Sequence, residues 1–372
     1  MGFVIAEIGT AHGGSEDAAV RLIDAAAAAG ADAVKFQWVY ADEILHPETG
    51  VVPLPGGDVR LYDRFRSLEC PPSFFKKLRS YARQKGVAFV CSPFGLRSLS
   101  ELLEIEPDYV KIASPELNHL PLLRAVQEAR SSRRKSGGDI PVIISSGVSR
   151  LSDIEAALDI LGTDGVTLLH CVTSYPAPAE EYNLRLLESL SRMFGVAVGV
   201  SDHSLDPVLV PSLAALCGAS VIEKHITLSR ADSGLDDPVA LEPEQFALMV
   251  RSVRQCGAAL ARYGAERGRE AVLRQLYDSF GQEAVDAALG DGVKRLAPSE
   301  AANYGRTNRS LHFMRGMDAG ETVRASDIAV LRTEKKLSPG LPPSFAELLA
   351  GARLARSVSD GDGVQLSDFL FR

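Results

Sequence analysis

The chain has 372 residues, which is longer than one average domain and favours two. Its 46% apolar and 24% charged residues are ordinary for a globular protein that buries a full core. The net charge of −8 argues against a nucleic acid or an anionic membrane as the main partner. No apolar run approaches the roughly 20 residues that span a bilayer. The cysteines are scattered and form no CxxC pair, so we expect free thiols in a reducing cytoplasm.

Short apolar runs alternate with amphipathic helical segments along most of the chain. The strand candidates are residues 3–9, 33–37, 88–94, 109–114, 141–147, 166–172, 196–202 and 221–227. Eight such β-then-α units fit a closed (β/α)₈ TIM barrel in number and length. A doubly wound open sheet is the alternative, but the GxGxxG expected after its first strand is absent, since the chain reads GTAHGG there.

Three segments follow the last barrel strand and its helix. Residues 262–288 are polar and helical in pattern, which predicts an extension of the eighth helix or a helical hairpin beyond it. Residues 289–308 are rich in Gly, Pro, Ser and Asn and are typical of a linker. Residues 309–372 hold short β-like pieces between glycine turns. We therefore expect a barrel domain over 1–288, a linker, and a small, mostly β domain.

Polar residues gather at the carboxyl ends of the predicted strands, where a TIM barrel carries its site. Lys35 and Gln37 share one strand face, as do Glu223 and His225, so Lys224 should point away from the cavity. A single polar residue there is most often a turn or packing residue. Several buried charges are harder to explain by packing, because an unpaired buried charge costs several kcal/mol. The set is Glu7, His12, Lys35, Gln37, Ser92, Lys111, Ser114, Ser145, Ser146, Thr173, Ser174, Tyr175, Ser201, His203, Glu223 and His225.

This set suggests chemistry on a charged small molecule. Lys35 and Lys111, with the serine hydroxyls, predict a cationic cup for a phosphorylated or carboxylated substrate. His203 and His225 could hold a divalent ion through neutral imidazoles and leave positions open for substrate oxygens and water. Glu7 is a candidate for proton transfer or for binding sugar hydroxyls. The residues indicate a metal-assisted reaction on a phosphorylated substrate.

A series of motifs in this chain resembles the sialic acid synthase family in order and spacing. They are IAEIGTAHGG, AGADAVKFQ, CSPF, VKIASPEL, IISSG, LLHCVTSYPAP, GVSDHS, IEKHITL with DSGLDDPVALEP, GDGVKR, PSEAAN and NRSL. The resemblance covers nearly the whole chain. Its last part resembles the sugar-binding antifreeze-like (SAF) domain of those synthases.

The resemblance implies condensation of phosphoenolpyruvate with an N-acylated aldose to a nine-carbon 2-keto-3-deoxy acid, with release of phosphate. It implies Mn²⁺ or Mg²⁺ on His203 and His225, catalytic roles for Glu7, Lys111, Glu116 and Glu223, and a domain-swapped homodimer. The implied phosphoenolpyruvate-binding positions are Lys35, Ser92, Lys111, Ser114, Ser145 and Ser201. The implied sugar-binding positions are Glu7, Gln37, Tyr175, Asp236 and, from the SAF domain of the partner subunit, Arg309.

Several positions depart from the family pattern, mostly on the sugar side. Ala11 replaces an asparagine, Pro115 a glycine, Thr173 an asparagine found in some members, and Asp237 a frequent histidine. The aldose therefore stays open between N-acetylmannosamine and the diamino sugars that give legionaminic or pseudaminic acid. Two other classes are a catalytically silent carbohydrate-binding relative and a metal-dependent pyruvate aldolase. The retained lysines and histidines argue against the first, and the phosphate cup argues against the second.

Overall fold

The computed structural model describes residues 2–54, 57–232, 234–334 and 336–370. Its centre is a closed barrel of parallel strands in the order β1-β10-β9-β8-β7-β6-β5-β2. The strands are β1 (Phe3–Gly9), β2 (Ala33–Trp38), β5 (Ala88–Pro93), β6 (Tyr109–Ile112), β7 (Val142–Ser145), β8 (Val166–Cys171), β9 (Ala197–Asp202) and β10 (Val221–His225). The TIM-barrel prediction is confirmed. The open-sheet alternative is wrong, because β1 pairs with both β2 and β10 and so closes the sheet.

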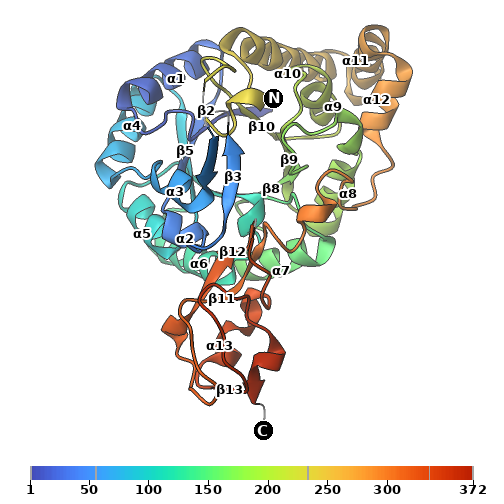
Figure 1. The fold of residues 1–372 in the computed structure, drawn as a ribbon. Coiled ribbons are helices and arrows are strands. Elements are labelled where there is room, and N and C mark those ends of the chain that lie inside the picture. Colours follow the sequence, from blue (N-terminus) through green and yellow to red (C-terminus); the bar gives the residue numbers. More distant parts are fainter. Residues whose placement is uncertain (1, 55–56, 233, 335, 371–372) are drawn as a thin grey trace.

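Helices surround the barrel as an outer ring (Figure 1). They are α1 (Glu16–Ala28), α4 (Pro72–Gln84), α5 (Leu96–Glu104), α6 (Leu120–Lys135), α7 (Leu151–Leu161), α8 (Leu186–Phe194), α9 (Leu209–Leu216) and α10 (Pro243–Tyr263). The longest insertion lies between β2 and α4 and holds α2 (Ala41–Ile44), the hairpin β3 (Val51–Leu54) and β4 (Gly57–Arg60), and α3 (Leu61–Arg66). None of the helices in the described residues is long and apolar enough to cross a membrane.

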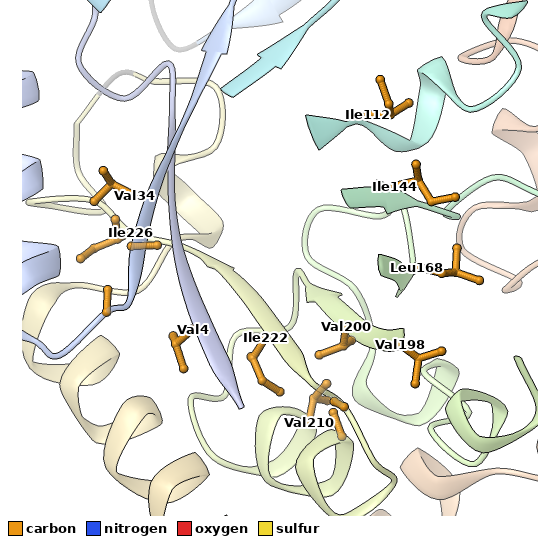
Figure 2. Packing of buried hydrophobic residues seen from close by; sticks show 14 of the residues in the cluster. Val4, Val34, Ile112, Ile144, Leu168, Val198, Val200, Val210, Ile222 and Ile226 are labelled. Atoms are coloured by element: carbon orange, nitrogen blue, oxygen red, sulfur yellow. The ribbon is translucent and has the colours of Figure 1, made fainter. Parts of the chain in front are cut away.

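Side chains alternate along each strand between the helices and the barrel interior. Val4 and Ile222 belong to the large cluster that joins the strands to the helices, and Figure 2 shows them on the outer side of the strands. The intervening inward residues form a separate apolar layer, made of Ile5, Ala33, Val90, Ile143, Leu169 and Val221. This layer is the floor of the barrel. Two residues further along several of these strands the inward position is polar and lines a cavity, as at Glu7, Lys35, Ser145 and Glu223.

The polar segment after the barrel is helical. It forms α11 (Ala265–Phe280) and α12 (Gln282–Leu289), so the hairpin form of the prediction holds rather than one continuous extension. Gly264 and Gly281 stand at the two breaks with φ of 79° and 81°, a left-handed conformation that glycine adopts without the usual steric penalty.

The C-terminal residues form a small, mostly β domain, as predicted. It pairs β11 (Arg309–Phe313) with β12 (Ile328–Arg332) and β13 (Arg353–Leu354) with β14 (Phe369–Leu370), beside the short helix α13 (Ala346–Leu349). Its own core includes Leu311, Phe313 and Val364. Figure 1 shows this domain, in orange and red, against one side of the barrel. Short 3₁₀ helices lie at Ser114–Glu116, Ala179–Glu181, Asp237–Val239, Ala301–Asn303, Ala325–Asp327, Pro343–Phe345 and Leu366–Asp368.

Candidate active site

A cavity of about 310 Å³ opens at the carboxyl ends of the barrel strands. Its size is that of a small-molecule site. Most of the predicted site residues line it. They are Glu7, Lys35, Gln37, Lys111, Ser114, Ser145, Tyr175, Ser201, His203, Glu223, His225 and Asp236.

Two lysines and two glutamates form a buried ionic cluster at the base of the cavity. The Nζ of Lys35 lies 2.7 Å from Oε2 of Glu7 and 3.6 Å from Oε1 of Glu223. The Nζ of Lys111 also lies 3.6 Å from Oε1 of Glu223. Strand register explains this arrangement, since Glu7 stands opposite Lys35 on β2 and opposite His225 on β10. The lysines are therefore charge-compensated, and the simple cationic cup expected from the sequence is corrected to a neutral cluster.

Burial and charge pull the pKa values of this cluster in opposite directions. Burial alone would raise the pKa of Glu223, but the lysines Lys111 and Lys35 outweigh it and lower that pKa to about 2. Burial likewise opposes the charge of Lys35, yet the carboxylates of Glu223 and Glu7 raise its pKa to about 12. For Lys111, burial wins and the pKa is lowered. Glu223 is thus a carboxylate at every physiological pH, and Lys111 is the more easily deprotonated lysine.

Hydroxyl groups orient the charged side chains of the cluster. Lys111 donates a hydrogen bond of 2.7 Å to Oγ of Ser145, and Oγ of Ser201 donates one of 2.9 Å to Glu223. The Oγ of Ser114 accepts from the backbone N–H of Gly147 at 3.0 Å. These bonds hold both ends of the Glu223–Lys111 pair in place.

The two histidines lie side by side above this cluster. Their ring centroids are 5.5 Å apart, and the ring of Tyr175 stacks on His203 at 4.2 Å. The Nδ1 of His203 lies 2.9 Å from the carbonyl oxygen of Val172, which places a proton on Nδ1 and leaves Nε2 as the atom that could bind a metal ion. Burial opposes the charge of His203, but the neighbouring Cys171 raises its pKa to about 9, so an ion bound at Nε2 would displace a proton. Burial lowers the pKa of His225, which keeps that imidazole neutral.

These residues fit a divalent ion with two protein ligands. Within the described residues, no group of three His, Cys, Asp or Glu side chains is placed to hold a metal. The carboxylate of Asp236 is 3.9 Å from Nδ1 of His225, which is too far for a direct hydrogen bond and is a distance that a water molecule can bridge. An ion on His203 and His225 would therefore keep most of its coordination sites for water and substrate oxygens.

Lys224 lies on the opposite face of β10, as its position between two inward residues predicted. Its Nζ donates to Oδ2 of Asp202 at 2.6 Å and to the backbone carbonyl and hydroxyl of Ser204. Both charged side chains are fully buried. The Lys224 charge is structural and ties β10 to the end of β9 on either side of His203.

Six predicted residues do not line the cavity, namely His12, Ser92, Glu116, Ser146, Ser174 and Arg309. Ser92 is fully buried, and its hydroxyl has no hydrogen-bond partner among the described residues. Glu116 was expected near the reacting centre, but its carboxylate is held by Arg309 at 2.9 Å and Arg332 at 2.8 Å.

Arg309 is bound to the barrel of its own chain. Besides Glu116, its guanidinium donates to the backbone carbonyls of Phe94, at 2.8 Å, and Glu43. Asn118 of the barrel also bonds the backbone of Arg309 through both its amide atoms. Within one chain, Arg309 and Glu116 bind each other and are not among the residues that line the cavity. The role of Arg309 over the sugar of a partner subunit stays a prediction. The swapped dimer stays a prediction.

Comparison with known proteins assigns both parts of the chain. Residues 22–264 match the model of the NeuB family, and residues 308–370 match that of the SAF domain. This chain belongs to the NeuB family. The family resemblance inferred from the motifs is confirmed.

Individual relatives match between 76% and 100% of this NeuB-family chain. The spore coat polysaccharide biosynthesis protein SpsE of Bacillus subtilis is 35% identical over 100% of this chain and 94% of that protein. Its crystal structure matches with a TM-score of 0.79 at 33% identity, covering 100% of this chain and 95% of that one. The N,N'-diacetyllegionaminic acid synthase of Campylobacter jejuni is 30% identical over 90% of this chain and 91% of that protein. The N-acetylneuraminic acid synthetase of Leptospira borgpetersenii has a TM-score of 0.59 and 29% identity, over 76% and 93% of the two chains.

The sequence patterns missed the residues that the C-terminal part contributes to the cavity. Asn303, Thr307, Arg332 and Glu334 all line it. The guanidinium of Arg332 lies 5.3 Å from the ring centre of Phe94, another lining residue that was not predicted. Of these four residues, only Asn303 lies within a quoted motif, PSEAAN. Placing the others requires knowing how the second domain docks.

Proposed function

We propose that this chain condenses phosphoenolpyruvate with an N-acylated aldose, forming a nine-carbon 2-keto-3-deoxy acid and releasing phosphate. The observation that carries this proposal is the single cavity in which the Lys35, Lys111, Glu7 and Glu223 cluster adjoins the histidine pair. The names of its relatives, which include legionaminic acid and sialic acid synthases, support the same reaction class.

In this proposal the lysines bind the anionic groups of phosphoenolpyruvate. Lys35 and Lys111 donate charge-assisted hydrogen bonds to its phosphate and carboxylate, and Ser145 orients Lys111. Glu7 and Glu223 already compensate the charge of both lysines, so binding the trianion phosphoenolpyruvate would be stabilised by a further positive charge in the cavity. A Mn²⁺ or Mg²⁺ ion held by His203 and His225 would supply that charge and would polarise the aldehyde oxygen as a Lewis acid.

The proposed reaction forms one carbon–carbon bond, adds one water molecule and breaks the bond to phosphate. The methylene carbon of phosphoenolpyruvate bonds to the aldehyde carbon, and positive charge develops at the carbon that bears the phosphate. Glu223, which remains ionised, stabilises that charge, and Glu7 is placed to accept a proton from the water that adds there. The carbon–oxygen bond to phosphate then breaks. Of the two protons of water, one ends on the former aldehyde oxygen and the other on phosphate.

The residues on the sugar side leave a choice of aldose. Gln37, Tyr175 and Asp236 line the cavity with groups that bind hydroxyl and amide groups. We propose N-acetylmannosamine as the first aldose to test and the diamino precursors of legionaminic and pseudaminic acid as the alternatives.

The test is phosphate release from phosphoenolpyruvate with each aldose, with and without EDTA, and mass spectrometry of the product. The proposal predicts phosphate release that requires both substrates and is abolished by EDTA. No release with any aldose would refute the proposed reaction. Pyruvate consumed in place of phosphoenolpyruvate would favour an aldolase.

The proposed metal-binding role of His203 is tested by a separate variant. His203→Ala should keep the circular dichroism spectrum of the fold and lose metal-dependent turnover. His46→Gln is the matched control, because His46 bonds Asp360 of the C-terminal domain and lies outside the cavity. Full activity in His203→Ala would remove the metal site from the proposal.

A further inference from the structure

Glu300, in the PSEAAN motif, carries a buried carboxylate to which the proposed reaction gives no role. Its side chain is 1% exposed. The Oε2 atom accepts hydrogen bonds from the backbone N–H of Val148 at 2.9 Å and of Thr173 at 2.7 Å. The Oε1 atom accepts one from Ala297 at 3.3 Å. Val148 follows β7 and Thr173 follows β8, so one carboxylate joins two loops at the cavity rim.

The loop after β7 is held by the same segment, residues 289–308, at further points. The side-chain amide of Asn308 donates to the carbonyl of Val148 at 3.1 Å, and the Nζ of Lys294 donates to the carbonyl of Ser146 at 3.2 Å. Val148 has a φ of 43°, a left-handed conformation that is unfavourable for a β-branched residue. Such a conformation persists only where its surroundings enforce it. Here the partners on both sides of Val148, Glu300 and Asn308, come from the linker.

This loop contacts residues that line the cavity. Ser145, immediately before it, accepts the hydrogen bond from Lys111. The N–H of Gly147 donates to Ser114, and a Cβ at Gly147 would lie 2.0 Å from Oγ1 of Thr173. Ser114, Ser145 and Thr173 all line the cavity. A shift of the loop would therefore disturb three lining hydroxyls, one of which, that of Ser145, is the partner of Lys111.

We propose that Glu300 is a positioning residue that builds the phosphoenolpyruvate side of the cavity from the linker. It fixes the positions of the loops after β7 and β8 relative to each other, so that Ser145 and Lys111 are placed to bind the substrate anion. This inference rests on the proposed function, because it names the substrate whose binding depends on Glu300. It also makes the segment before the SAF domain a working part of the barrel site rather than a tether.

The test measures the dissociation constant of phosphoenolpyruvate by titration calorimetry on the full-length protein. Glu300→Ala leaves two buried N–H groups unpaired and should weaken phosphoenolpyruvate binding about tenfold or more. Glu300→Gln keeps one acceptor oxygen for both N–H groups and should restore binding to within about threefold of wild type. Thermal unfolding of each variant reports the fold separately.

Glu181→Ala is the matched control. Glu181 accepts from the N–H and the hydroxyl of Ser299, beside Glu300, but is not among the residues that line the cavity. This variant should lower the unfolding temperature without changing phosphoenolpyruvate binding. If Glu300→Ala does not fold, Asn308→Ala takes its place. It removes the hydrogen bond to the carbonyl of Val148 and should also weaken phosphoenolpyruvate binding.

The outcomes separate this inference from the proposed function. Wild-type binding in Glu300→Ala, equal losses in the alanine and glutamine variants, or an equal loss in Glu181→Ala would each overturn the role of Glu300 alone. A wild-type protein that binds no phosphoenolpyruvate would overturn the proposed function and this role with it.

Discussion

Replacing Glu223 by glutamine should make anion binding fail at alkaline pH. The Oε1 atom of Glu223 lies 3.6 Å from Nζ of Lys111 and 3.6 Å from Nζ of Lys35. At an effective dielectric constant of about 20, a pair of unit charges at this distance attracts by about 4 to 5 kcal/mol. Burial already lowers the pKa of Lys111, and Glu223 is the largest influence that opposes this. The variant therefore lowers the pKa of Lys111 further and shifts its deprotonation towards neutral pH.

The sign of the effect follows from which form of Lys111 binds. Only the ammonium form attracts the phosphate, so binding is lost as the pH rises through the lysine pKa, and the variant loses it at lower pH than wild type. We would measure phosphoenolpyruvate dissociation constants by calorimetry from about pH 6 to about pH 10, which spans the ordinary range of a perturbed lysine. Ser201→Ala is the control, because it removes a hydrogen bond to Glu223 but no charge. Parallel pH profiles for Glu223→Gln and wild type would refute the coupling.

Two further predictions concern stability. Lys224→Met leaves Asp202 buried without its cation and should lower the free energy of unfolding in urea by about 3 to 5 kcal/mol. Adding Asp202→Asn should recover most of the lost stability. A double variant that recovers none would contradict the ion-pair account. Gly147→Ala places a methyl group against Thr173 and should cost about 1 to 3 kcal/mol and reduce turnover. The double variant with Thr173→Ala should relieve part of this loss, and a double variant no better than Gly147→Ala would show that the contact is not the cause.

The barrel was predictable from sequence because its signal is local and repeated. Each strand candidate is a short apolar run, and the alternation of inward and outward side chains follows from the pleat of a strand. The same alternation placed Lys35, Glu223 and His225 on the inner face and Lys224 on the outer one. Because parallel strands of a barrel all end at one rim, residues distant in sequence could be assigned to one cavity.

The charge state of the cavity was not predictable in the same way. Two lysines at strand ends suggested a cationic cup, but the register of β1 against β2 and β10 pairs them with Glu7 and Glu223. Register depends on how the barrel closes, and a shift of two residues would keep every side chain on its face while changing its partner.

Sequence alone determined the barrel, the small β domain and the set of polar strand ends, since these depend on patterns within a few residues. Tertiary structure alone decided what the second domain does at the site. The docking of that domain buries Arg309 against Glu116 and brings Arg332 to the cavity, and the linker before it places Glu300 against two barrel loops. These contacts join residues more than a hundred positions apart, and no periodicity within either segment encodes them.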